Sequence, residues 1–149
     1  MAFGLSMYPI VYLARFNPDT KKWSEQWIEK DTVPYDTLMK MSEEERSKVL
    51  ENRNNLGLPG VSYTSQYGYG CFEGMKAFPT KDGGIGIFRP DRNAARFANS
   101  MEGLKTERFP EDMFVKASIE FIKRNNALGY LPEYNSEWEK DNYASASAI

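Results

Sequence analysis

Two side chains with reactive chemistry lie within one glycine-rich stretch, residues 66–78. Cys71 carries the single thiol of the 149-residue chain, and Lys76 carries an amine of the kind that forms Schiff bases. Three glycines and several aromatic side chains surround them. Closely spaced glycines predict a backbone that bends or approaches another group, and the aromatic side chains predict that this group has an apolar face. We therefore expect a binding loop that leads into a strand.

The composition excludes several kinds of site. The chain has no histidine, which rules out a histidine-based triad or metal centre, and one cysteine cannot build a disulfide or a cysteine zinc site. A net charge of −2 argues against nucleic-acid partners, because a phosphate backbone needs a basic surface. We find neither a signal peptide nor an apolar run of about 18 residues. The sequence therefore predicts a soluble, cytoplasmic protein without a membrane partner or a metal.

The elements that must position the glycine-rich stretch can be predicted from local patterns. Residues 10–16 are rich in β-branched and aromatic side chains, and a turn at 17–20 returns the chain through 22–28. In that second strand Trp23 and Trp27 are an even number of positions apart, so they share one face. These patterns predict an N-terminal hairpin.

A helix and a second hairpin are predicted next. Ser42 and Glu45 have the spacing of a capping box, which starts a helix that runs to about Asn52. Residues 81–84 have the composition of a hairpin turn, with a strand before them and a return strand at 85–88. The glycine-rich stretch thus leads directly into this second hairpin.

Two consecutive helices follow. The first begins near Asp91, has an apolar stripe through residues 94–101, and places Arg92 and Arg96 on its opposite face. The second begins at Pro110 and has a wide apolar face. We therefore expect an α+β domain in which the two hairpins form one antiparallel sheet and the two helices pack on one face of it.

Three motifs of this chain, taken together, resemble those of one enzyme family. These motifs are Tyr-Gly-Tyr-Gly-Cys-Phe-Glu-Gly-Met-Lys-Ala-Phe at 67–78, Phe-Arg-Pro at 88–90 and Asn-Ala-Ala-Arg at 93–96. Together they resemble the N-terminal small domain of branched-chain amino acid aminotransferases, which are pyridoxal 5'-phosphate enzymes of fold type IV. The resemblance extends from about residue 3 to residue 131. Its specific part is Phe-Glu-Gly-x-Lys-Ala followed one hairpin later by Phe-Arg-Pro.

The resemblance implies roles for particular residues. Arg96 matches the arginine that binds the cofactor phosphate, while Tyr67 and Phe72, together with Phe3, match residues that line the substrate side-chain pocket. Lys76 matches a structural position, which we expect to be solvent-facing or ion-paired. Without the resemblance, Arg96 is better explained as a solvated helix residue. Phe72 is then explained as a core residue, which does not exclude a place in the pocket wall.

The resemblance also implies a longer enzyme. Such an enzyme transfers the amino group of leucine, isoleucine or valine to 2-oxoglutarate with pyridoxal 5'-phosphate as its cofactor, and it works as a homodimer. Its Schiff-base lysine belongs to a C-terminal cofactor domain that residues 1–149 do not contain. We therefore interpret the chain as a fragment, the N-terminal small domain, which has no catalytic residue and is inactive alone.

Two alternatives remain open from the sequence. The chain could be a standalone interaction or regulatory module derived from the aminotransferase domain. It could also be an RNA-binding domain, because the aromatic stretch 67–78 has some likeness to the strand on which RNA-recognition motifs stack bases. The second alternative requires a basic sheet face and a βαββαβ order of elements.

Overall fold

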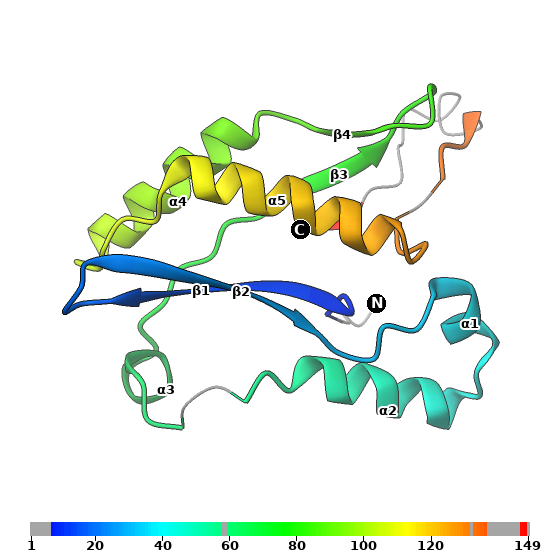
Figure 1. The fold of residues 1–149 in the computed structure, drawn as a ribbon, viewed down its shortest axis with the longest axis horizontal. Coiled ribbons are helices and arrows are strands. Elements are labelled where there is room, and N and C mark those ends of the chain that lie inside the picture. Colours follow the sequence, from blue (N-terminus) through cyan, green and yellow to red (C-terminus); the bar gives the residue numbers. More distant parts are fainter. Residues whose placement is uncertain (1–6, 58–59, 132, 137–146, 149) are drawn as a thin grey trace. The chain divides into compact units, whose positions relative to one another are not determined.

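The structure is a computed structural model (Figure 1). It describes residues 7–57, 60–131, 133–136 and 147–148. These residues form five helices and five strands, and the strands pair in antiparallel fashion. The predicted α+β class is therefore confirmed.

The chain divides into two compact units. The first contains Met1–Gly60 and Lys123–Tyr130, and the second contains Val61–Ile122 and Leu131–Ile149. The chain thus completes the first unit only after it has passed through most of the second.

The first unit is built on a long hairpin. β1 (Ile10–Asn17) pairs along its whole length with β2 (Lys22–Glu29), as the sequence predicts. Aromatic rings from the two strands meet at centroid distances of 5.1 and 5.3 Å, because side chains of one parity share a face. The ring pairs are Tyr12 with Trp27 and Phe16 with Trp23.

Two helices follow this hairpin. α2 (Glu43–Asn54) begins with the predicted capping box, in which the Ser42 hydroxyl accepts from the Glu45 amide at 3.3 Å and the Glu45 carboxylate accepts from the Ser42 amide at 3.0 Å. The helix is mostly exposed, as its polar sequence predicts, apart from the buried Arg53. α1 (Tyr35–Lys40) is not predicted from the sequence, because a six-residue helix after a proline is too short to show periodicity.

Arg53 is the centre of a set of contacts that we call the buried cluster, formed by Arg53, Tyr130 and the backbone of Asp31 and Val33. The Arg53 side chain is 1% exposed, and its Nη2 donates to the Tyr130 hydroxyl and to the Asp31 carbonyl, each at 2.6 Å. The guanidinium also stacks on the Tyr130 ring at 5.0 Å. Tyr130 in turn donates to the Val33 carbonyl at 2.6 Å. A helix, a turn and a distant loop are thereby tied to one cation.

Asn125 closes the first unit from the end of α5 (Glu111–Asn126). Its amide is fully buried, and it accepts from the Ile10 amide at 3.2 Å and donates to the Ile10 carbonyl at 2.9 Å. Both backbone groups at the start of β1 are therefore satisfied by one side chain that lies 115 positions later in the chain.

The second unit contains the predicted second hairpin. β3 (Lys76–Pro79) pairs with β4 (Ile85–Ile87) through a turn in which the Thr80 amide donates to the Gly84 carbonyl at 2.9 Å. β3 also pairs on its other side with β5 (Ser147–Ala148). The sequence-based expectation of one sheet from both hairpins is wrong for the described strands, which form two separate sheets. Turn residues specify which neighbouring strands pair, but the joining of distant strands depends on tertiary packing.

The two predicted helices are confirmed as α4 (Pro90–Gly103) and α5. In Figure 1 they lie side by side, and rings from α4, α5 and the segment between them pack together. These rings belong to Phe97, Phe109 and Phe114. Beneath α5, the core of this unit joins the helix to the second sheet through Ala77, Ile122 and Leu131, with Ile85, Ile87 and Phe121 packed against them. α5 therefore holds the β3–β4 hairpin, which continues from the glycine-rich stretch.

Candidate functional site

The glycine-rich stretch begins in a short helix rather than in a loop. α3 (Tyr63–Tyr67) is capped by Ser62, whose hydroxyl accepts from the Ser65 amide at 3.1 Å. The helix ends at Gly68, which has φ +63° and therefore occupies the left-handed region where a side chain is strained. This glycine allows the chain to leave the helix and run toward β3.

Between Cys71 and Ala77 the burial of successive residues alternates. Phe72 and Lys76 are exposed, whereas Glu73 is largely covered and Ala77 is fully buried. This alternation is typical of an extended chain, whose side chains point to opposite sides in turn. Lys76 is solvent-facing, as expected, and Cys71 is half-buried. Among the described residues, neither of the two reactive side chains is joined to a partner that would activate it.

The two described pocket candidates are strongly exposed. Phe72 is 93% exposed and Tyr67 is 78% exposed, so neither is a core residue of this unit. Tyr67 lies within 6.3 Å of the Tyr63 ring, measured between centroids. The third candidate, Phe3, lies outside the described residues.

Arg96 lies in a polar group that we call the open cluster, made of Glu73, Asn93 and Arg96. Arg96 Nε donates to Glu73 Oε2 at 3.1 Å, and Arg96 Nη2 donates to Glu73 Oε1. Asn93 Nδ2 donates to the same Oε1 at 2.8 Å and to the Gly74 carbonyl at 3.1 Å. Asn93 and Arg96 reach one carboxylate because residues three apart share a face of helix α4.

Exposure within the open cluster is uneven. The Glu73 side chain is 9% exposed, whereas the Arg96 side chain is 63% exposed. Hydrogen bonding from Arg96 lowers the pKa of Glu73, and Asn93 adds to this effect, while burial opposes it. The same pair raises the pKa of Arg96. The cluster is therefore a permanent ion pair near neutral pH, with its carboxylate covered and its cation facing outward.

One edge of the Arg96 guanidinium is not used. In the part of the chain that the structure describes, no group hydrogen-bonds to Nη1. Nη1 and the second hydrogen of Nη2 form the planar pair of donors that binds phosphate or carboxylate in bidentate fashion. We call this pair the open edge of Arg96. It makes Arg96 a chemically competent anion contact.

The structure brings together only some of the candidate residues. Glu73 follows Phe72 directly, so Arg96 is attached to the segment that carries Phe72. Tyr67 belongs to α3, and no hydrogen bond or ring contact joins it to Arg96 among the described residues. Sequence reasoning missed Glu73 and Asn93 as partners. The sequence signal that could have found this contact is Glu73 itself, a carboxylate at a covered position of an alternating segment. A carboxylate in that position requires a cationic partner.

The Phe-Arg-Pro motif forms the start of α4. Arg89 precedes the helix with φ +49°, and its Nε and Nη2 donate to the Asp91 carboxylate at 2.9 and 2.7 Å. This contact lowers the pKa of Asp91 to about 2. Both partners are exposed, and Nε and Nη2 of Arg89 are engaged with a residue in the first turn of the helix that follows. Arg89 is thus arranged to start the helix that carries Arg96.

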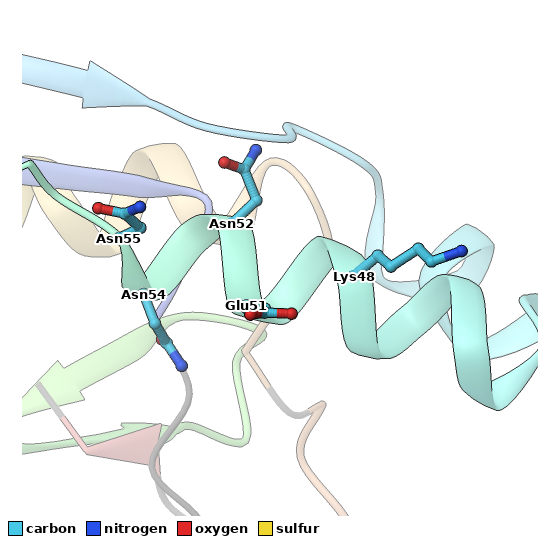
Figure 2. Close-up of a pocket in the computed structure, with 5 residues that line it drawn as sticks. All are labelled: Lys48, Glu51, Asn52, Asn54 and Asn55. Carbon is cyan, nitrogen blue, oxygen red and sulfur yellow. The ribbon is translucent and has the colours of Figure 1, made fainter.

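A polar hollow of about 650 Å³ lies in the first unit along α2 (Figure 2). Its labelled side chains point in different directions rather than toward one centre. Several of their polar groups already serve the fold: Asn54 accepts from the Met7 amide at 3.1 Å and Asn55 accepts from the Gly57 amide at 3.2 Å. The residues that line it are Lys48, Glu51, Asn52, Asn54 and Asn55. None of them is a predicted site residue, and the hollow lacks convergent groups that would orient a ligand.

No described helix has the length and apolar character needed to cross a membrane. Within the same residues, cysteine, aspartate and glutamate side chains do not gather in threes as a metal ion would require.

Comparison with known proteins supports the resemblance. A branched-chain-amino-acid aminotransferase of Haemophilus influenzae is 46% identical over 76 residues, which is 51% of this chain and 22% of that protein. One from Helicobacter pylori is 39% identical over 87 residues, covering 58% of this chain and 25% of that protein. A transaminase of Aspergillus rugulosus is 35% identical over 104 residues, covering 70% of this chain and 22% of that protein. No family model matches the chain.

The matched part of the chain is therefore related to the aminotransferases. More particularly, it is related to the branched-chain aminotransferases and to transaminases similar to them, which confirms the resemblance seen in its motifs. The matches span about a quarter or less of the length of these relatives.

Proposed function

We propose that this chain is the N-terminal small domain of a pyridoxal 5'-phosphate-dependent aminotransferase. In the complete enzyme the amino group of leucine, isoleucine or valine passes to 2-oxoglutarate. Bound pyridoxal 5'-phosphate supplies the electron sink for this chemistry, while the protein binds and orients the reactants. The observation that carries the proposal is the open edge of Arg96. Glu73 holds the guanidinium in place, and the N–H groups of the open edge remain for an anion.

The donor set of the open cluster fits a phosphate group in part. One guanidinium supplies a bidentate contact, and its positive charge complements a phosphate dianion. A phosphate has more acceptor positions than one guanidinium fills, and the cofactor also needs a Schiff-base lysine. We propose that these remaining contacts come from a C-terminal domain. In this proposal the chain alone has no catalytic residue and does not catalyse transamination.

The exposed aromatic side chains support the proposed pocket for the substrate side chain. Phe72 and Tyr67 expose large apolar faces, which is costly unless another group covers them. We propose that they line the pocket for a branched aliphatic side chain, with Phe3 contributing from the N-terminal segment. The complete enzyme is proposed to be a cytoplasmic homodimer.

The phosphate contact can be tested on the chain itself. Pyridoxal 5'-phosphate and pyridoxal, which lacks the phosphate, are titrated separately and binding is followed by calorimetry. We expect the wild-type chain to prefer the phosphorylated form and Arg96→Gln to lose this preference. Arg92→Gln is the matched control, because Arg92 lies one turn earlier on α4 and is also exposed. An unchanged preference in Arg96→Gln contradicts the phosphate contact.

The lysine assignment has a separate test. Borohydride treatment of the chain with pyridoxal 5'-phosphate, followed by mass spectrometry of peptides, is expected to give no modification confined to one lysine. A stable adduct at Lys76 alone would overturn the proposal that the Schiff-base lysine lies elsewhere.

A second candidate function is a standalone interaction module. It is favoured by the large exposed hydrophobic side chains of the second unit, which include Val61, Tyr63 and Phe88 as well as the two pocket candidates. Reading the coding sequence beyond Ile149 separates the two functions. A Tyr-x-Arg-Pro continuation supports the longer enzyme, whereas a stop codon supports the module. We do not propose RNA binding, because the described elements run ββαααββααβ rather than βαββαβ.

A further inference from the structure

We propose that Glu73 is a positioning residue, whose carboxylate fixes the Arg96 guanidinium so that its open edge is presented to a phosphate group. This inference rests on the proposed function, because it concerns the orientation of the same arginine. Glu73 itself does not contact the phosphate in this proposal.

Two nitrogens of the Arg96 guanidinium are held by Glu73. Glu73 takes Nε and Nη2, the side-on edge of the guanidinium. Because the guanidinium is planar, fixing this edge also fixes the direction of Nη1. A long arginine side chain that is 63% exposed would otherwise sample many rotamers, and an anion would have to order it on binding.

Glu73 is itself held on more than one side. Asn93 binds Oε1 and the neighbouring Gly74 carbonyl, so it fixes both the carboxylate and the backbone that carries it. Glu73 is 9% exposed, and the next inward-facing side chain of its segment, Met75, is buried. The carboxylate therefore has little freedom of its own, as a positioning group requires.

A contrary effect makes the proposal falsifiable. The negative charge of Glu73 repels a phosphate, so removing it would strengthen phosphate binding if charge alone mattered. Positioning predicts the opposite result, because a freed Arg96 must be ordered again by the ligand. The sign of the change in affinity thus separates the two effects.

The test uses inorganic phosphate and the Arg Nε–H signals of the ¹⁵N-labelled chain in nuclear magnetic resonance. In the wild type we expect a protected Arg96 Nε–H signal that shifts as phosphate is added. In Glu73→Ala we expect that protection to be lost and phosphate affinity to fall by about tenfold, by analogy with the loss of metal affinity when groups that orient metal ligands are removed. Glu73→Gln keeps one acceptor for Arg96, so we expect partial protection and an intermediate affinity.

The controls separate failure of this inference from failure of the proposed function. Asp112→Asn removes one negative charge from an exposed pair with Lys116 in the same unit, and it should leave both readouts unchanged. If Arg96 Nε–H stays protected in Glu73→Ala, or if phosphate binds that variant as tightly as the wild type or more tightly, positioning is overturned. If the wild type shows no phosphate-dependent shift, or Arg96→Gln binds as well as wild type, the phosphate contact itself is wrong. Should Glu73→Ala fail to fold, Glu73→Gln carries the same comparison.

Discussion

The buried cluster around Arg53 and the open cluster around Arg96 use the same side chain in opposite ways. Arg53 is enclosed and has neutral partners, a carbonyl, a hydroxyl and an aromatic ring. Arg96 is mostly exposed and has a charged partner that is itself covered. An enclosed guanidinium can connect only parts of its own fold, whereas an exposed and oriented one keeps donors for a ligand. Exposure of the guanidinium, rather than residue type or the mere presence of unused donors, distinguishes a structural arginine from a binding one.

The largest effect expected from this comparison is on stability at Arg53. Arg53→Ala removes two hydrogen bonds to a cation and a ring contact. It also removes the buried Nε and Nη1, which have no hydrogen-bond partner among the described residues. The net loss should be about 2 kcal/mol of unfolding free energy, measured by urea denaturation. Lys48→Ala, at an exposed position of the same helix, should change it by less than about 0.5 kcal/mol. Equal effects of the two substitutions would remove the distinction between enclosed and exposed cations.

Glu73 of the open cluster should contribute to the pH dependence of stability, alongside other carboxylates with a lowered pKa such as Asp91, whereas the buried cluster contains no carboxylate side chain. Because the folded-state pKa of Glu73 is lowered, its ion pair contributes stability above the unfolded pKa near 4.5 and loses it as pH falls through the lower folded value. Urea denaturation at pH 7 and at pH 3 should therefore show a smaller acid-induced loss for Glu73→Gln than for the wild type. Arg53→Ala should retain the wild-type loss. A steeper acid-induced loss in Glu73→Gln would show that the ion pair does not stabilise the fold.

The smallest expected effect is at Phe72. Phe72→Ala should change the unfolding free energy by less than about 0.5 kcal/mol, because a side chain that is 93% exposed contributes little packing to this unit. Ile122→Ala is the contrasting control in the core of the same unit and should cost about 3 kcal/mol. Thermal unfolding of the two variants measures both losses of stability. A large loss of stability in Phe72→Ala would mean that the Phe72 ring is covered in solution.

The sequence predicted those parts of the fold that depend on near neighbours. The capping box at Ser42, the hairpin turn before Gly84 and the apolar stripe of α4 are each encoded within a few residues. Short helices such as α3 gave no periodic signal, and the separation of the sheets depends on contacts between distant segments. Local patterns carry no information about those contacts.

The candidate site was predictable only where a motif carried it. The resemblance selected Arg96, and helical spacing showed that it faces away from the apolar stripe of its helix. Its link to Glu73 joins residues 23 positions apart, and no spacing rule connects a helix to the extended segment that it packs against. The roles of Tyr67 and Phe72 as pocket wall stay predictions.

Asn125 has a consequence for the order in which the chain can fold during synthesis. The first strand leaves the ribosome early, but the amide that satisfies its first residue is made 115 residues later. At a synthesis rate of about 5–20 residues per second, that delay is about 6 to 23 s, far longer than a hairpin needs to form. The nascent hairpin must therefore wait with both polar groups of Ile10 supplied by water, and its final closure coincides with the end of α5.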